Sequence, residues 1–99
     1  MNKIRRKRIA EISHQLEGIK EQVNQLEILK GEIEELQTEE QEAYDNLPEG
    51  LQQADKGQNM EQAAEALGDT VSQIDDVISA ITESIDELLT ALGAAAGVA

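Results

Sequence analysis

The chain has 99 residues and a formal net charge of −13, and it contains no Cys, Trp or Phe and a single Tyr. The lack of Cys excludes disulfides, thiolate metal sites and cysteine nucleophiles. Large aromatic side chains dominate most globular cores, so their scarcity disfavours a compact globule. The length fits one domain, residues 1–99, and the composition fits a core of Leu, Ile and Val between long helices.

The first predicted element is a long helix over residues 3–47. Its apolar residues recur in steps of three and four, which is the heptad pattern of a coiled coil. The pattern slips at Leu29, and two consecutive steps of three are expected to overwind the helix locally. Pro48 ends the helix because it disfavours helical geometry in the preceding residue and lacks a backbone donor. The first part of this seam comprises Ile9, Ile12, Leu16, Ile19, Val23 and Leu26.

A connection over residues 48–58 precedes a second predicted helix over residues 59–92. This helix has the strongest pattern in the chain, with apolar residues at every a and d position. Ile at both positions favours bundles of more than two helices. Gly93 is expected to stop the helix, leaving residues 93–99 as a flexible tail. The residues expected to form the core or an oligomer contact are Ile9, Ile12, Leu16, Ile19, Ile74, Ile78, Ile81 and Ile85.

The two helices are expected to fold back on each other. If Leu47 faces Met60, the numbers of facing residues add up to about 107, so that Ile33 meets Ile74. The second helix is then too short to cover Ile9 and Ile12. We therefore predict an all-α fold, an antiparallel two-helix coiled-coil hairpin that assembles with further copies into an oligomeric helical bundle.

The charge is unevenly distributed along the sequence. Residues 1–8 carry five basic side chains, and the rest of the chain carries three basic and 21 acidic ones. Nucleic acids and anionic membranes repel such a polyanion, so contact with nucleic acid is expected only through the basic N-terminus. The run is either a solubilising end or a binding site, and its clash with the helix dipole favours binding. Its members are Lys3, Arg5, Arg6, Lys7 and Arg8.

Several residue pairs resemble parts of metal-binding or catalytic sites, but each is more simply interpreted as a set of side chains that face solvent. Glu11 and His14 form a Glu-x-x-His pair like that of di-iron bundles, but their heptad positions face water. Neighbouring carboxylates such as Glu34 and Glu35 lie on a helix face without a pocket. Glu40 falls on the seam, where it either fixes the register or turns out to water. We expect a protein without catalytic activity, metal or cofactor.

The segment Glu39–Leu67 contains the turn sequence NLPEGLQ at residues 46–52 and a Met-Glu-x-Ala start of the second helix at residues 60–63. It resembles a segment of small uncharacterised coiled-coil proteins of phages and prophages of Gram-positive bacteria. The resemblance implies a phage-associated helical protein and transfers no activity or site residue. No apolar run approaches the ~20 residues of a membrane span, so we expect a location in the host cytoplasm with no membrane association.

Two leading functions remain at this stage, beside a weaker third in which the basic ends tether the protein to DNA. The first is an interaction or assembly protein that self-associates and docks on a partner whose identity the sequence does not reveal. The second is an acidic inhibitor that mimics DNA and occupies the groove of a host nucleic-acid-binding protein. DNA carries one charge per ~1.7 Å of axis, a density that carboxylates on stiff helices can imitate.

Overall fold

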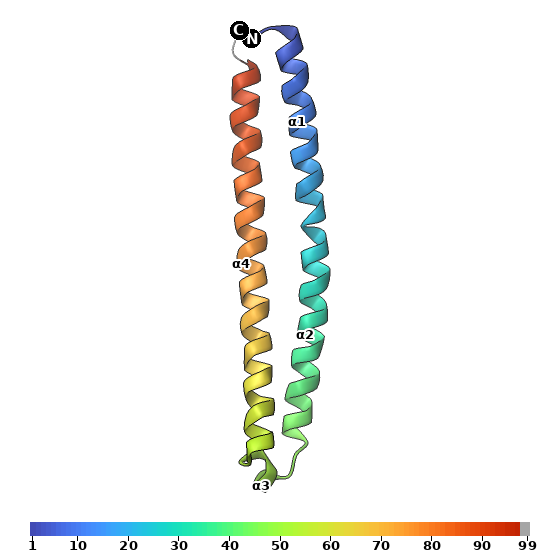
Figure 1. Ribbon diagram of the computed structural model, residues 1–99, viewed down its shortest axis with the longest axis vertical. Coiled ribbons are helices and arrows are strands. Elements are labelled where there is room, and N and C mark those ends of the chain that lie inside the picture. Colours follow the sequence, from blue (N-terminus) through green and yellow to red (C-terminus); the bar gives the residue numbers. More distant parts are fainter. Residues whose placement is uncertain (98–99) are drawn as a thin grey trace. The chain divides into compact units, whose positions relative to one another are not determined.

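The computed structural model describes residues 1–97 of the chain, and these residues form helices and short connections with no strand. The helices are α1 (Lys3–Gln22), α2 (Asn24–Asp45), α3 (Glu49–Gln52) and α4 (Asp55–Gly97) (Figure 1). The all-α prediction is confirmed. The chain divides into two compact units. Unit 1 comprises residues 1–26 and 77–99, and unit 2 comprises residues 27–76.

The helix predicted over residues 3–47 is interrupted at Val23. The Val23 amide donates to the Lys20 carbonyl at 3.2 Å, and the Leu26 amide donates to the Val23 carbonyl at 2.9 Å. Both hydrogen bonds span three residues, which is tighter winding than the α-helical pattern. The buried or half-buried residues of this region follow one another in steps of three: Lys20, Val23 and Leu26. The stammer therefore lies one step earlier than predicted, and the overwinding interrupts the helix.

The connection between the long helices is shorter than predicted. It contains α3, whose first turn closes with Leu51 N–H donating to the Pro48 carbonyl at 2.8 Å. α4 begins at Asp55 and not at residue 59. Gly57 permits this early start, because a Cβ atom at Gly57 would collide with the Gln52 carbonyl oxygen. The missing side chain lets the first turn of α4 pass directly against the backbone of α3.

The C-terminal end of α4 corrects a second boundary. The helix continues through Gly93 to Gly97, where the sequence predicted a stop at residue 92. No described glycine has the positive φ of a left-handed helix cap. Alanine has the highest helix propensity, so the run of three alanines after Gly93 sustains the helix. The last two residues of the predicted tail, 98 and 99, lie outside the described part of the chain.

Within unit 2, α2 and the first half of α4 lie side by side (Figure 1). Lys30 Nζ donates to Asp75 Oδ1 at 2.8 Å, and the Gln37 amide nitrogen lies 2.7 Å from where a Cβ of Gly68 would be. Residue numbers therefore fall along α4 as they rise along α2. Each of these pairs adds up to 105, within two residues of the expected 107. Ala64 is the most deeply buried apolar residue of this unit, at 2% exposure.

Within unit 1, α1 lies beside the second half of α4 (Figure 1). Lys20 Nζ donates to Asp86 Oδ1 at 2.6 Å across the two helices. Among the described residues of this unit, the buried apolar side chains are Val23 and Ile85. The interior of unit 1 is thus a narrow seam. No described helix has an apolar stretch long enough to cross a bilayer.

Candidate functional site: the basic tip and the apolar edge of unit 1

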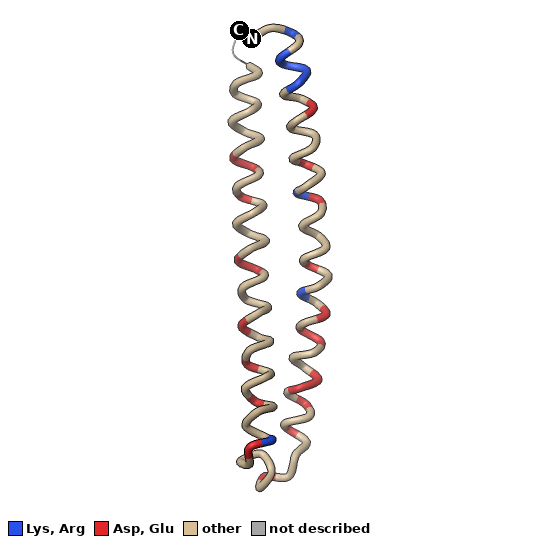
Figure 2. Tube along the Cα trace, in the orientation of Figure 1, with Lys and Arg blue, Asp and Glu red and all other residues tan. Residues whose placement is uncertain are grey.

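The five basic residues predicted as a partner site occupy the first two turns of α1. We call Lys3, Arg5, Arg6, Lys7 and Arg8 the basic tip; all five are exposed. Asn2 caps the helix, and its Oδ1 accepts from the Arg5 amide at 2.8 Å. Figure 2 shows Lys and Arg gathered at this end of α1.

The basic tip surrounds the helix and does not form a stripe. Successive residues are about 100° apart around a helix, so five basic residues within six positions point in all directions. The first turn holds no acidic residue to offset them. Positive charge at a helix N-terminus opposes the helix dipole. The arrangement suits contact with an anionic surface of another molecule, approached from any side.

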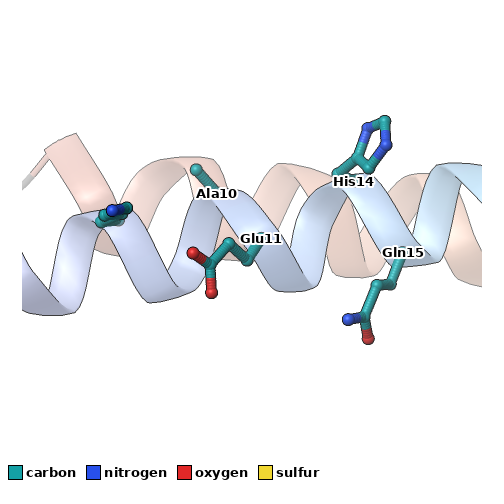
Figure 3. Close-up of a pocket in the computed structure, with 5 residues that line it drawn as sticks. Ala10, Glu11, His14 and Gln15 are labelled. Carbon is teal, nitrogen blue, oxygen red and sulfur yellow. The ribbon is translucent and has the colours of Figure 1, made fainter.

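A shallow groove lies beside the tip on the side of α1 that faces away from α4. It is lined by Lys7, Ala10, Glu11, His14 and Gln15. Figure 3 shows the Glu11 carboxylate and the His14 ring diverging from each other. No group of three or more His, Cys, Asp or Glu residues able to hold a metal occurs among residues 1–97. This groove brings no set of converging polar groups together.

Ion pairs across the helices define one edge of each unit. In unit 1 this polar edge is the Lys20–Asp86 pair. In unit 2, Lys30 pairs with Asp75 at 2.8 Å and with Glu27 at 3.2 Å, and its side chain is only 19% exposed. The hydrogen bonds that Lys30 donates to Asp75 and then to Glu27 raise the pKa of Lys30 above its usual value. These pairs hold one flank of each seam closed.

The opposite flank of unit 1 is apolar. Ile19 directly precedes Lys20 and therefore points about 100° away from the polar edge. On α4, Asp86 lies on one side of the buried Ile85 and Leu88 lies on the other. Val77 is about three helical turns before Leu88 and therefore lies on the same side of α4 as Leu88. Four side chains of this flank are exposed by 47–51%. We call them the apolar edge: Ile12, Ile19, Val77 and Leu88.

The other predicted seam residues are more covered than the apolar edge. Ile85 is buried, and the remaining five are half-buried: Ile9, Leu16, Ile74, Ile78 and Ile81. In α1, Ser13 and Lys20 are more covered than Ile12 and Ile19. α1 is therefore rotated about its own axis relative to the predicted heptad phase. The rotation is about half of the roughly 100° that separates neighbouring residues around a helix. This rotation places Lys20 within reach of Asp86 and moves Ile12 and Ile19 toward the solvent.

Sequence reasoning missed the interhelical ion pairs. Lys30 and Asp75 both occupy e positions of the predicted heptads, where antiparallel helices bring flanking residues together. A search of those positions for opposite charges would have found the pair. No signal was available for Lys20–Asp86, because the rotation of α1 that brings it about is not encoded in the spacing of apolar residues.

Comparisons with known proteins give no assignment. No family model, curated protein or solved structure matches the chain.

Proposed function

We propose that the protein is a non-enzymatic, phage-associated assembly protein whose helices form an antiparallel coiled-coil hairpin in the host cytoplasm. In this proposal the hairpin self-associates into a helical bundle and docks on a partner through the basic tip. The observation that carries the proposal is the apolar edge, where four large aliphatic side chains stay half exposed. Beside it, the seam of unit 1 buries only Val23 and Ile85 among the apolar residues that the structure describes. Two helices cannot cover that edge, whereas a bundle can.

The energetic gain from covering the edge is substantial. Burying an exposed Val, Leu or Ile side chain completely contributes about 1.5–3 kcal/mol. About half of that gain is still available at each of the four positions, which amounts to roughly 3–6 kcal/mol per protomer. Folded proteins are stable by only about 5–15 kcal/mol in total. Self-association would therefore add a large fraction to the stability of so small a chain.

The basic tip supports docking on an anionic partner. Its position at a helix N-terminus disfavours the helix, so helix stability does not explain it. Five exposed cations on two turns can pair with carboxylates or phosphates of another molecule. Acidic proteins and nucleic acids both carry the anionic groups that the tip can bind, and capture from lysate with and without nuclease separates them.

The alternative function is mimicry of DNA, and unit 2 favours it. Unit 2 carries 15 acidic and two basic side chains. Fourteen of the acidic residues lie on α2 and the first half of α4, each roughly 33 Å long at 1.5 Å per residue. Together the two helices present one carboxylate per roughly 2.4 Å of axis, against about 1.7 Å per phosphate in a duplex.

Light scattering coupled to gel filtration tests self-association. We expect at least a dimer at micromolar concentration, and a helical monomer would contradict the proposal. Capture of partners from host lysate, with and without nuclease, then identifies what the protein binds. Binding of a nucleic-acid-binding enzyme would favour mimicry, and binding of a virion component would favour assembly.

Two charge variants separate the tip from the acidic surface. One replaces the basic tip, Lys3, Arg5, Arg6, Lys7 and Arg8, with Gln. The other replaces Asp69, Asp76 and Glu83 with Gln; all three are exposed. We expect the tip variant to lose partner binding and the acidic variant to keep it, at low and at high salt. The reverse result would replace docking through the tip by mimicry. Circular dichroism checks that both variants remain helical.

A further inference from the structure

The apolar edge of unit 1 has the properties of an interface. Ile12 and Ile19 are seven residues apart on α1, and Val77 and Leu88 are eleven residues apart on α4, so each pair is aligned along its helix. At the tip end, Met1, Arg5, Arg8, Ile9 and Ile12 line a hollow that continues this flank. Half-exposed aliphatic side chains in a row, with a hollow at one end, suit the side of another helix.

We propose that the apolar edge is the surface on which a second copy of this chain packs, through the same edge and in the antiparallel orientation. This inference rests on the self-association proposed above and specifies where it occurs. A symmetric dimer needs a self-complementary patch. Ile12 and Ile19 meet that requirement, because a two-fold axis midway between them places Ile12 of each copy against the partner's Ile19.

Charge favours a second copy as the occupant of this edge. Unit 1 carries six basic and six acidic side chains and is therefore neutral, whereas unit 2 carries a net charge of −13. Two copies meet little net repulsion if they join through unit 1 and strong repulsion if they join through unit 2. Unit 2 also exposes large aliphatic side chains, among them Leu29 and Leu36, but the apolar edge belongs to the unit without net charge.

Charge also selects the orientation. A parallel pair would place two basic tips, five cations each, beside one another. An antiparallel pair that overlaps over unit 1 places the tip of each copy beside the end of unit 1 that holds Glu21 and Glu83. Opposite charges then meet at both ends of the contact, and like charges are separated. With the two-fold axis midway between Ile12 and Ile19, the axis passes near Gln15.

Substitutions on the two edges of unit 1 test the location of the interface. The variant Ile19→Gln with Leu88→Gln makes the apolar edge polar. The control, Lys20→Gln with Asp86→Asn, changes the adjacent polar edge and leaves the net charge unchanged. Analytical ultracentrifugation should show dimerisation weakened by at least about 100-fold in the first variant and by less than about tenfold in the control. Circular dichroism verifies that both variants are helical.

Spin labels on the otherwise unchanged protein test the orientation and do not depend on the edge variants folding. The chain has no Cys, so Gln15→Cys and Gln22→Cys each accept a single label. Both positions are exposed and flank the apolar edge. In an antiparallel dimer the two labels at position 15 lie close together, and those at position 22 are separated by about 21 Å along the axis. A parallel dimer would give two similar short distances.

The outcomes distinguish this inference from the proposed function. A wild-type protein that is monomeric contradicts both. If the wild-type protein self-associates and the edge variant does so equally well, self-association stands and the apolar edge is not the interface. If the edge variant dissociates but both labels report short distances, the interface stands and the antiparallel orientation is wrong.

Discussion

Unit 1 and unit 2 are built alike but carry different charges. Each has two long helical segments side by side, with one edge closed by a Lys–Asp pair across the helices. Unit 1 holds as many basic as acidic side chains, whereas the acidic side chains of unit 2 outnumber its basic ones by 13. Figure 2 shows the difference, with red positions recurring along α2 and the first half of α4.

The comparison shows that the heptad pattern and the charge pattern are independent in this chain. The heptad pattern determines which side chains lie between helices, and it continues along α4 through both units. Charge determines what each unit can approach, because the net field decides which partners are attracted or repelled. In the proposal above, unit 1 contacts another copy, and unit 2 faces solvent or a cationic partner.

The largest effect is expected in the interior of unit 1. Ile85 is 6% exposed, and replacing a buried Ile with Ala typically costs about 2–5 kcal/mol. Ile85→Ala should lower the free energy of unfolding by that amount in urea denaturation. Asp76→Ala, at an exposed position, should change it by no more than about 0.5 kcal/mol. Equal effects of the two substitutions would mean that Ile85 is not part of the interior.

Salt should affect the two units differently. Raising the ionic strength from about 0.01 M to about 1 M shortens the Debye length from about 30 Å to about 3 Å. Like charges four residues apart, such as Glu61, Glu65 and Asp69, each cost roughly 0.2–0.5 kcal/mol. Screening several such pairs should stabilise unit 2 by on the order of 1–2 kcal/mol. Hydrogen exchange followed peptide by peptide should show added protection in α2 and little change in α1.

A weaker salt response in unit 2 than in unit 1 would contradict that comparison. It would mean that the Lys30 pairs with Asp75 and Glu27 outweigh the repulsion among the remaining carboxylates. Lys30→Gln then provides the control, because it removes both ion pairs. If repulsion dominates, this variant should gain more protection from salt than the wild-type protein.

Matched glycine substitutions should stabilise each unit by a similar, smaller amount. Gly18 in α1 and Gly31 in α2 have open space where a Cβ atom would lie. Gly→Ala in a helix interior contributes about 0.5–1 kcal/mol, so thermal unfolding should shift upward in both variants. Gly57→Ala is the opposite control, since its Cβ would collide with the backbone of α3. Stabilisation by Gly57→Ala would contradict the packing of α3 against α4.

Sequence patterns predicted the helices well where one physical signal decided the outcome. The uninterrupted heptads of α4 predicted that Ile85 lies on the seam, and it is buried. The boundaries of α4 failed because they depend on competing effects. Gly57 allowed an early start through close backbone approach, and the alanines after Gly93 outweighed its tendency to end a helix.

The phase of α1 was beyond sequence reasoning for a different reason. Apolar spacing favours Ile12 and Ile19 on the seam, yet the Lys20–Asp86 pair occupies one flank and both isoleucines are half exposed. The rotation depends on residues 66 positions apart in the chain. A pattern read along one helix contains no information about which residue of the other helix it will meet. The apolar edge follows from this rotation and could be identified only with the structure.

The smallest predicted effect is on the pKa of Tyr44, the only tyrosine in the chain, which reports on unit 2. Burial, and then a hydrogen bond to Glu61, raise the pKa of Tyr44 above its ordinary value of 10.0. The pKa of Tyr44 is higher in the folded than in the unfolded protein. Neutral Tyr44 therefore contributes to the free energy of unfolding fully below pH 10, and this contribution is lost as the pH rises through the folded pKa. Tyrosinate absorbance should give a higher pKa for the folded protein than for the protein in urea. Glu61→Gln should lower that pKa only part of the way, because burial is the larger cause. A complete return to the ordinary value in Glu61→Gln would show that Glu61 alone perturbs Tyr44 and that burial does not contribute to its raised pKa.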